Sequence, residues 1–272
     1  MIVDFTMEDS VLEQPAFVRD EAAYNLLHLI TESKQALCLT SRGRKIIYAQ
    51  TPGHNGWLWL AEQATDSERE RLIHQLVDNL AKRDIVLPGV TGAARTVELF
   101  AERYAAARRL AYETYMGMES YSCPNAPYRP SVAGRLRASN RQDAPVIAEF
   151  LAGFQADAYG TPSAAEDHLA AAEWMSSNGK MYVWVIDDEI VSMANLAHRS
   201  RRYGRINSVY TPRPHRKKGY ASAIGSALCS ILHSEKLIPM LYADQQNPDS
   251  NRVYRNVGFL PSGIVNDVRF LG

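Results

Sequence analysis

The sequence is poor in cysteine, with only Cys38, Cys123 and Cys229, which lie far apart. It has no CxxC pair and no cysteine and histidine spacing of the kind that binds a metal ion. These thiols are therefore expected to stay reduced, as in a cytoplasmic protein. The sequence predicts no metal cofactor.

Long apolar runs and targeting signals are also missing. No apolar run approaches the roughly 18 residues that a membrane span needs. The opening stretch, MIVDFTMEDS, carries acids instead of the basic and apolar regions of a signal peptide. We therefore expect no membrane partner and a cytoplasmic location.

Neither sign of charge is in excess, because 30 lysines and arginines balance 30 aspartates and glutamates. A dedicated nucleic-acid binder normally carries a basic excess, so nucleic acid is not predicted as a partner. With 46% hydrophobic and 22% charged residues, the composition is that of a globular protein. Its 272 residues exceed what one core usually holds, so two domains are expected.

The first half alternates between strand and helix patterns. Thr65 and Glu68 form a capping-box pattern at the start of a helix whose apolar face is Leu72, Ile73, Leu76, Val77 and Leu80. The predicted strands are 45–50, 56–62, 85–90 and 111–119, and the predicted helices are 65–84 and 94–110. Residues 122–131 hold three prolines and little periodicity, so we place a linker there.

The second half repeats nearly the same order of elements. The predicted strands are 134–139, 205–211, 238–244 and 262–272, with a hairpin over 181–198 that turns at Asp187 and Asp188. The predicted helices are 144–154, 163–177, one that begins at Gly219, and 249–259. The sequence therefore predicts an α/β protein with a duplicated fold, divided into domains 1–130 and 131–272.

One segment, VYTPRPHRKKGYASAIGSAL, places a basic loop at the mouth of a helix. The loop contains Arg213, His215, Arg216, Lys217 and Lys218, and Gly219 opens the helix. A helix start offers unpaired N–H groups and a positive dipole end, and glycine lets a ligand approach the backbone closely. This design suits a phosphate or pyrophosphate, although a solvated basic loop with an ordinary glycine is the alternative. The Walker pattern GxxxxGK[ST] and the pattern GxGxxG do not occur.

Arg216, Gly219 and Ala221 form an RxxGxA pattern after a strand. This pattern resembles the pyrophosphate loop, Q/R-x-x-G-x-G/A, of the GNAT acyl-CoA N-acyltransferase superfamily. The downstream segment LYADQQNPDSNRVYRNVGF resembles the second signature of that family, a strand followed by Asn, a helix carrying Tyr, and Gly-Phe. The resemblance covers about 134–272. The duplicated layout further resembles a bacterial group with a degenerate first repeat and an active second repeat.

The resemblance implies two GNAT-like mixed-sheet domains with helices on both faces, of which the second binds acetyl-CoA or another acyl-CoA. It implies a cofactor site made by Val209, Tyr210, Thr211, Arg216, Lys217, Lys218, Gly219, Tyr220, Ala221, Ser222, Asn247 and Asn251. The backbone of 209–211 would pair with the pantetheine arm, and the amides of 217–222 would hold the pyrophosphate. Tyr254 would be the general acid that protonates the leaving thiolate.

For two of these residues, a purely structural role is the alternative. Tyr254 could be a helix tyrosine that packs under the loop, and Asn247 could be a turn residue before Pro248. Many family members place a glutamate base where this sequence has Tyr242. The base is therefore open, with candidates Asp244, Glu189, Asn207, Ser208 and His198.

The first half has no comparable loop, because its helix begins with ATDSERERL, where Glu68 and Glu70 would repel a pyrophosphate. We expect no CoA site there; this half could shape the acceptor pocket, cover the second sheet or form a homodimer. The predicted reaction is acyl transfer, most simply of acetyl, from acyl-CoA to a small primary amine by direct attack on the thioester. The alternative is an acyl-CoA-binding or sensing module without catalysis.

Overall fold

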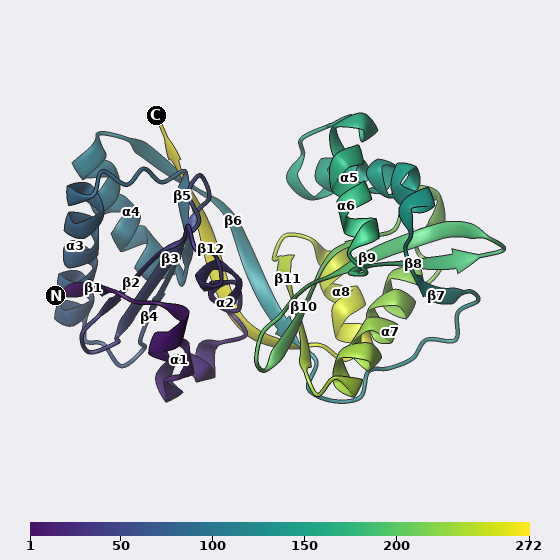
Figure 1. Cartoon of the computed structure of the whole chain (residues 1–272), viewed down its shortest axis with the longest axis horizontal. Coiled ribbons are helices and arrows are strands. Elements are labelled where there is room, and N and C mark those ends of the chain that lie inside the picture. The colour runs from purple at the N-terminus through teal and green to yellow at the C-terminus, as the bar shows by residue number, and fades with distance from the viewer. The chain divides into compact units, whose positions relative to one another are not determined.

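The computed structural model describes all 272 residues, which form two compact units (Figure 1). The first unit contains Met1–Ser120 and Ser262–Gly272, and the second contains Tyr121–Pro261. The division therefore comes earlier than the predicted boundary at residue 130. The last strand was predicted to end the second domain, but it lies in the first unit because β12 (Leu260–Leu271) pairs antiparallel with β5 (Gly89–Gly92).

In the first unit, β1 to β5 and then β12 are neighbours in the sheet, in that order. The strand before the second unit is β6 (Ala111–Ser122). The other elements are β1 (Ile2–Asp4), β2 (Leu37–Ser41), β3 (Ile46–Gln50), β4 (Gly56–Leu60), α1 (Pro15–Asp20), α2 (Leu26–Thr31), α3 (Asp66–Lys82) and α4 (Ala94–Arg108).

Helices cover both faces of this sheet. The predicted apolar face of α3 is confirmed, since Leu72, Ile73, Leu76, Val77 and Leu80 are all buried in one core with Leu58, Leu60 and residues of α4. Trp59 lies between Leu58 and Leu60 in β4, so its side chain points to the opposite face. There it contacts Phe17 of α1 edge-on, with ring centroids 5.5 Å apart.

Two local predictions in this unit need correction. The Thr65 hydroxyl accepts the Glu68 N–H at 3.3 Å, but the Glu68 carboxylate binds Lys45 at 2.8 Å instead of completing a capping box. The strand predicted over 85–90 begins only at Gly89. Ile85 still follows helix α3, donating its N–H to the Leu80 carbonyl, and Pro88 has no N–H to give to a strand ladder.

The second unit has the predicted order of strands and helices, and its sheet order is β7-β8-β9-β10-β11. Only β10 and β11 pair in parallel, while the other neighbours are antiparallel. The strands are β7 (Arg135–Ala138), β8 (Met181–Ile186), β9 (Glu189–Arg199), β10 (Tyr203–Tyr210) and β11 (Ile238–Asp244). The helices are α5 (Ala144–Tyr159), α6 (Leu169–Ser177), α7 (Tyr220–Ser234) and α8 (Pro248–Val257).

Each face of this second sheet carries its own core. Ile147 and Phe150 of α5 pack with Met181 and Met193 on one face, where α6 also lies. The other face packs against α7 and α8, and the residues of this core include Leu196, Ile206, Ile224, Leu228, Leu241 and Val257. In Figure 1, α5 and α6 lie on one side of β8 and β9, and α7 lies on the other.

Helix α6 is shorter and less buried than the sequence predicts. Its first predicted turn is the 3-10 segment Ala165–His168, and the helix itself starts at Leu169. Ala172 and Ser176 are buried and lie one turn apart on the same face. The apolar residues Leu169 and Trp174 do not pack into the core, since their side chains are 39% and 64% exposed.

Candidate functional site

Strands β10 and β11 separate towards their carboxyl ends. Their parallel pairing runs from Tyr203 opposite Ile238 to Arg205 opposite Met240 and does not continue to the end of either strand. On the other side of β10, the register with β9 shifts between Asn207 and Tyr210, where Ser208 has a φ of +50°. This bulge bends β10, so the edge of β10 that faces β11 is left without a partner strand after Arg205.

Helix α7 begins beside this open edge. Gly219 is its N-cap residue, with a φ of +85°, and no side chain caps the helix. The amides of Tyr220, Ala221 and Ser222 therefore keep no acceptor within the chain. A Cβ at position 219 would approach Cγ2 of Val132 to 2.8 Å, so only glycine fits this start without strain.

The basic loop before the helix divides into two parts. Lys217 and Lys218 are exposed and make no ion pair, so their charges are available to an anion. Arg213 and Arg216 are engaged: both bind Asp157 at the end of α5, and Arg213 does so at 3.0 Å. These two guanidinium groups hold the pKa of the Asp157 carboxyl below its usual value.

Arg216 also shapes the loop. Its Nε donates to the Thr211 carbonyl at 2.9 Å, and its guanidinium lies 5.5 Å from the centre of the Tyr210 ring. The Tyr210 carbonyl accepts from the Ser192 hydroxyl at 2.9 Å. The carbonyls of Tyr210 and Thr211 are thus occupied, which leaves Val209 and the amides of this segment for the predicted pairing with a cofactor arm.

The asparagines after β11 build the turn into α8. Asn247 caps this helix by accepting the Ser250 N–H at 3.0 Å. Asn251 donates to the carbonyls of Asp244 and Asn247 at 2.9 and 2.7 Å, and accepts from the Tyr121 hydroxyl at 3.0 Å. Both N–H groups of Asn251 are used, so the structure does not support its predicted contact with a cofactor.

Tyr254 of α8 lies between two other aromatic rings. Its ring centroid is 6.2 Å from that of Tyr121 and 5.9 Å from that of Phe259. Its hydroxyl makes no hydrogen bond within the protein, and burial raises its pKa to about 12. The ring therefore packs against its neighbours, as expected for a structural helix tyrosine. The hydroxyl keeps its proton and has no hydrogen-bond partner in the protein.

The two acidic candidates for a general base both have partners. Glu189 lies 3.2 Å from His215, and Asp244 accepts the Gln246 N–H at 2.9 Å. Asn207 accepts from Asn195 at 2.9 Å, and Ser208 stands at the bulge of β10. The structure therefore singles out no carboxylate in the place of the missing glutamate.

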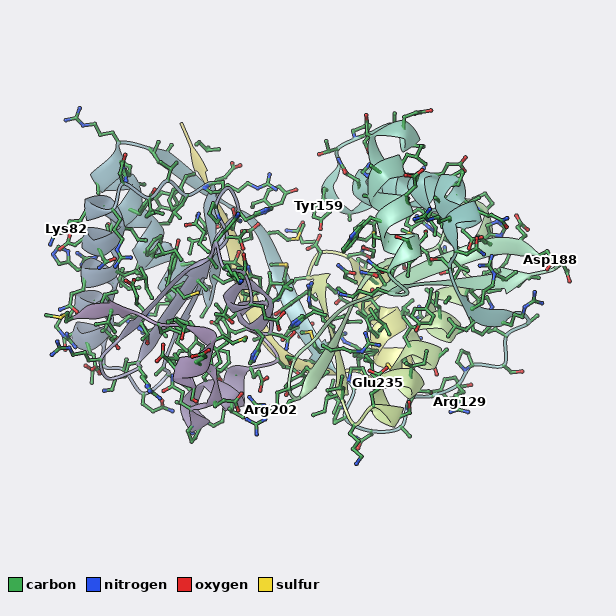
Figure 2. The ribbon with its side chains drawn as sticks, in the orientation of Figure 1. Lys82, Arg129, Tyr159, Asp188, Arg202 and Glu235 are labelled. Atoms are coloured by element: carbon green, nitrogen blue, oxygen red, sulfur yellow. The ribbon has the colours of Figure 1, made fainter.

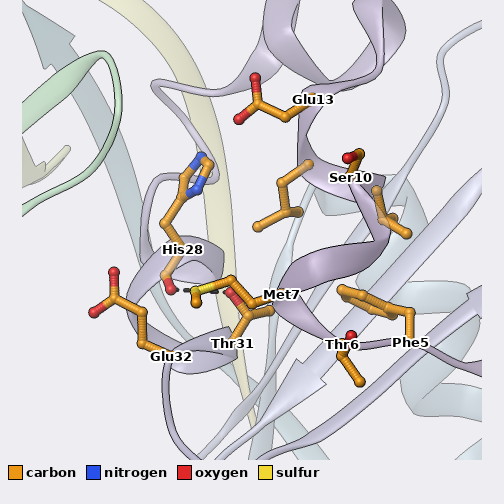
Figure 3. Close-up of a pocket in the computed structure, with 10 residues that line it drawn as sticks. Phe5, Thr6, Met7, Ser10, Glu13, His28, Thr31 and Glu32 are labelled. Atoms are coloured by element: carbon orange, nitrogen blue, oxygen red, sulfur yellow. Dashed lines mark hydrogen bonds between the residues drawn. The ribbon is translucent and has the colours of Figure 1, made fainter.

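The structure also has two pockets, one in each unit. In the second unit, Phe150, Ile190, Pro214 and neighbours line a hollow behind the basic loop. The first unit has a pocket in which Met7, His28 and Thr31 face one another (Figure 3). The second-unit hollow is lined by the candidate base Glu189 and by His215 of the basic loop, but by none of the residues predicted to bind the cofactor, and the first-unit pocket is lined by no predicted site residue.

The matching helix of the first unit, α3, has an occupied start. Thr65 caps it, Asp66 pairs with Arg95 at 2.9 Å, and Glu68 pairs with Lys45. Strands β4 and β5 stay together, since a Cβ on Gly92 would lie 2.2 Å from the Leu58 carbonyl oxygen. This unit therefore shows no cradle for an anion and no separated strands.

No helix is long and apolar enough to cross a bilayer. No group of three or more histidine, cysteine, aspartate or glutamate side chains is arranged to hold a metal ion.

The second unit thus combines parallel strands that separate with a helix that starts uncapped at a glycine, as the GNAT resemblance predicts. Residues 146–259 match the sequence model described as Acetyltransferase (GNAT) family. Residues 146–259 thus form a GNAT acetyltransferase domain within the second unit. No curated protein sequence matches the chain.

Solved structures share the fold over both units. One is a GCN5-related N-acetyltransferase from Sphaerobacter thermophilus, with TM-score 0.61 and 15% identity, covering 99% of this chain and 94% of that one. A GNAT-family acetyltransferase from Colwellia psychrerythraea has TM-score 0.58 and 10% identity, covering 99% and 98%. A Drosophila protein has TM-score 0.67 and 10% identity, also covering 99% and 98%.

Proposed function

We propose that the second unit transfers an acetyl group from acetyl-CoA to a primary amine by direct attack on the thioester. One observation carries this proposal: β10 separates from β11, and the helix that follows β10, α7, starts uncapped at Gly219. A pyrophosphate at the helix start and an extended arm along the open strand edge would satisfy both sets of unpaired backbone groups.

In this proposal, the amides of Lys217 to Ser222 hold the pyrophosphate, and Lys217 and Lys218 add charge. The backbone at Val209 and the neighbouring amides pairs with the pantetheine arm. Arg216 holds the shape of the basic loop and does not itself contact the pyrophosphate, because its guanidinium is bound to Asp157 and to the Thr211 carbonyl. Asn247 shapes the β11–α8 turn that carries Tyr254 into the site.

The reaction joins a neutral amine nitrogen to the thioester carbonyl carbon and breaks the carbon–sulfur bond. The products are an amide and the thiol of CoA, so the proton lost by the amine balances the one gained by sulfur. With a pKa of about 12, Tyr254 is a weaker acid than a thiol, whose pKa is about 8.5. We therefore assign Tyr254 to stabilising the departing sulfur through a hydrogen bond from its hydroxyl.

No carboxylate in the site is placed to take the proton of the amine. We propose that the neutral fraction of the acceptor is the reacting species and that its proton leaves through water. The rate should then rise with pH until the pKa of the acceptor amine is passed.

We further propose that the first unit is a degenerate GNAT-like domain without a CoA site. This unit corresponds to the domain predicted over residues 1–130. Support comes from the capped start of α3 and from the closeness of β4 and β5. The predicted cytoplasmic location stays part of this proposal.

The test is a coupled measurement on the purified full chain. Acetyl-CoA affinity is measured by calorimetry, and release of the CoA thiol is followed in the presence of a panel of primary amines. The proposal expects binding, and thiol release only when an amine is present. Binding without amine-dependent release would reject acyl transfer to the amines tested and favour a binding module.

A further inference from the structure

A polar cluster lies on one face of the second sheet, at the point where β10 and β11 separate. We define the acceptor-face cluster as Asn195, His198, Arg205, Asn207 and Tyr242. Arg205 lies opposite His198, and Asn207 lies opposite Asn195, in the β9–β10 register. Directly opposite residues of an antiparallel pair share a face of the sheet.

The neighbours of these residues fix which face this is. A Cβ on Gly204 would lie 2.2 Å from Leu232 of α7, and Ile206 is buried in the core against α7. Arg205, between them, therefore points to the opposite face, which is covered by α5 and α6. The same argument applies to Tyr242, because Leu241 and Ala243 belong to the α7 core.

Arg205 has no carboxylate partner in the protein, and its only electrostatic interaction is with Tyr242 of the same cluster. It is half-buried, makes no hydrogen bond or ion pair, and its Nε is shielded from solvent without an acceptor. Burial lowers its pKa, although arginine stays charged in proteins. An uncompensated charge in such a place is costly, and natural proteins retain one mainly where something else pairs with it.

Two other arginines of this unit, Arg137 and Arg199, show the contrast. Arg137 binds Asp143 through two hydrogen bonds of 2.6 and 2.9 Å. Arg199 binds Glu235 in the same two-pronged way at 2.6 and 3.0 Å. Arg205 alone among these three lacks the carboxylate that its planar, forked guanidinium matches.

A second unsatisfied atom lies on the same face. Asn195 is 7% exposed and donates to Asn207 at 2.9 Å, but its own side-chain carbonyl oxygen is buried without a partner. Asn207 is two residues beyond Arg205 along β10, or about 7 Å in an extended strand. The cluster thus offers a cationic donor and, a short distance away, a neutral acceptor.

We propose that Arg205 binds an anionic group, a carboxylate or a phosphate, on the amine acceptor, while Asn195 accepts an N–H of the same molecule. The inference rests on the proposed function, because Arg205 and Met240 form the last pair before β10 and β11 separate. A molecule held there lies at the fork where the thioester arm would end. The acceptor class is then an amine that also carries an anion.

Matched pairs of amines test this directly. Glycine is compared with methylamine, L-lysine with cadaverine, and 2-aminoethyl phosphate with ethanolamine. For each, kcat/KM is measured at saturating acetyl-CoA, and binding is measured by calorimetry to the protein saturated with CoA. The proteins are wild type, Arg205→Gln, Arg205→Lys and the control Arg135→Gln, which removes an exposed arginine paired only with Asp188.

The proposal expects wild type to prefer the anionic member of at least one pair about tenfold or more in kcat/KM. Arg205→Gln should abolish that preference while acetyl-CoA affinity stays within about twofold, and Arg205→Lys should keep part of it because it retains the charge without the fork. Whichever pair responds distinguishes a carboxylate from a phosphate.

Equal use of both members, binding of the uncharged members alone, or no binding of any anionic amine to the CoA-saturated protein would each overturn the inference. So would an equal loss for both members in Arg205→Gln when the folded fraction is unchanged by circular dichroism. If Arg205→Gln does not fold, Arg205→Lys and the wild-type pair ratios decide. Failure of wild type to bind acetyl-CoA would overturn the proposed function itself, which is a different result.

Discussion

The two units start a helix after a parallel strand in opposite ways. Helix α3 of the first unit begins with a threonine cap, and the acids of its first turn are paired with Arg95 and Lys45. Helix α7 of the second unit begins with Gly219 and leaves its first amides open. One helix start is satisfied by its own chain, and the other leaves its first amides available to a ligand.

The parallel strand pairs that precede the two helices also differ, in how far their pairing extends. In the first unit, β4 and β5 pair from Gly56 opposite Val90 to Leu58 opposite Gly92, and Gly92 lets them approach closely. In the second unit, β10 and β11 pair only at their beginnings. In our proposal, function thus depends on a few positions at one edge of the second sheet, as is usual for folds that serve several roles.

The largest effect is expected from closing the open helix start. Gly219→Glu adds a side chain where φ is +85° and Val132 is 2.8 Å away, and it puts a negative charge beside the pyrophosphate. Acetyl-CoA affinity should fall by about 100-fold or more, measured by calorimetry. Gly179→Glu is the control, because Gly179 also has a positive φ, of +70°, in open space. An equal loss in both variants would show that backbone strain alone is responsible.

The next effect concerns the chemical step, which our proposal assigns to the second unit. Tyr254→Phe removes a hydroxyl that has no partner in the protein, so kcat should fall by about 100-fold with little change in acetyl-CoA affinity or stability. Tyr128→Phe, at a 65% exposed tyrosine, is the matched control. A kcat equal to that of wild type would remove Tyr254 from the mechanism.

The same tyrosine predicts a dependence of stability on pH. Its pKa is raised from 10 to about 12 in the folded protein, so folding favours the protonated form. The stability it contributes is complete below pH 10 and declines as pH rises towards 12. Urea unfolding of wild type and Tyr254→Phe across this range should show a smaller loss for the variant.

A smaller effect is expected from the support behind the basic loop. Asp157→Asn weakens the attachment of Arg213 and Arg216, so KM for acetyl-CoA should rise about three- to tenfold while kcat changes little. Asp157→Glu should restore part of the loss. Asp188→Asn is the control, since Asp188 lies at the tip of the β8–β9 hairpin and pairs only with exposed Arg135 (Figure 2).

The pKa of Asp157 is lowered, so its carboxylate contributes above pH 3.8 and its contribution is lost as pH falls through the folded pKa. The effect of Asp157→Asn on KM should therefore be constant over the neutral range. A change in kcat with an unchanged KM would contradict a positioning role.

The smallest effect lies in the first unit. Thr65→Ala removes the cap of α3 and should cost about 1 kcal/mol in the free energy of unfolding, measured by urea denaturation. Acetyl-CoA affinity should stay the same, because this helix binds no CoA in our account. An altered affinity or stoichiometry would show that the first unit takes part in cofactor binding.

The strands and helices of the second unit could be read from the sequence because local signals agree there. Asp187 and Asp188 turn a hairpin with positive φ, Gly258 ends α8 with a φ of +111°, and β11 has the predicted bounds. In the first unit, the 3-10 and short helical segments before β2 carry weak periodicity and were not predicted.

Long-range pairing and orientation could not be read from local signals. The assignment of β12 to the first unit depends on its pairing with β5, far away in the sequence. Trp174 is the largest apolar residue of α6, yet it is 64% exposed, and the buried face of this helix is formed by Ala172 and Ser176. Of the site, Gly219 and Tyr254 were visible as motif positions, whereas Asp157 and the unpaired Arg205 emerge only from tertiary contacts.

The most direct test of the comparison is the stoichiometry of acetyl-CoA binding to the wild-type chain by calorimetry. One site per chain, lost in Gly219→Glu and kept in Thr65→Ala, is the result that the account predicts. Two sites per chain would contradict the assignment of the first unit as a domain without a CoA site. No binding at all would contradict the assignment of α7 as the place where the cofactor is held.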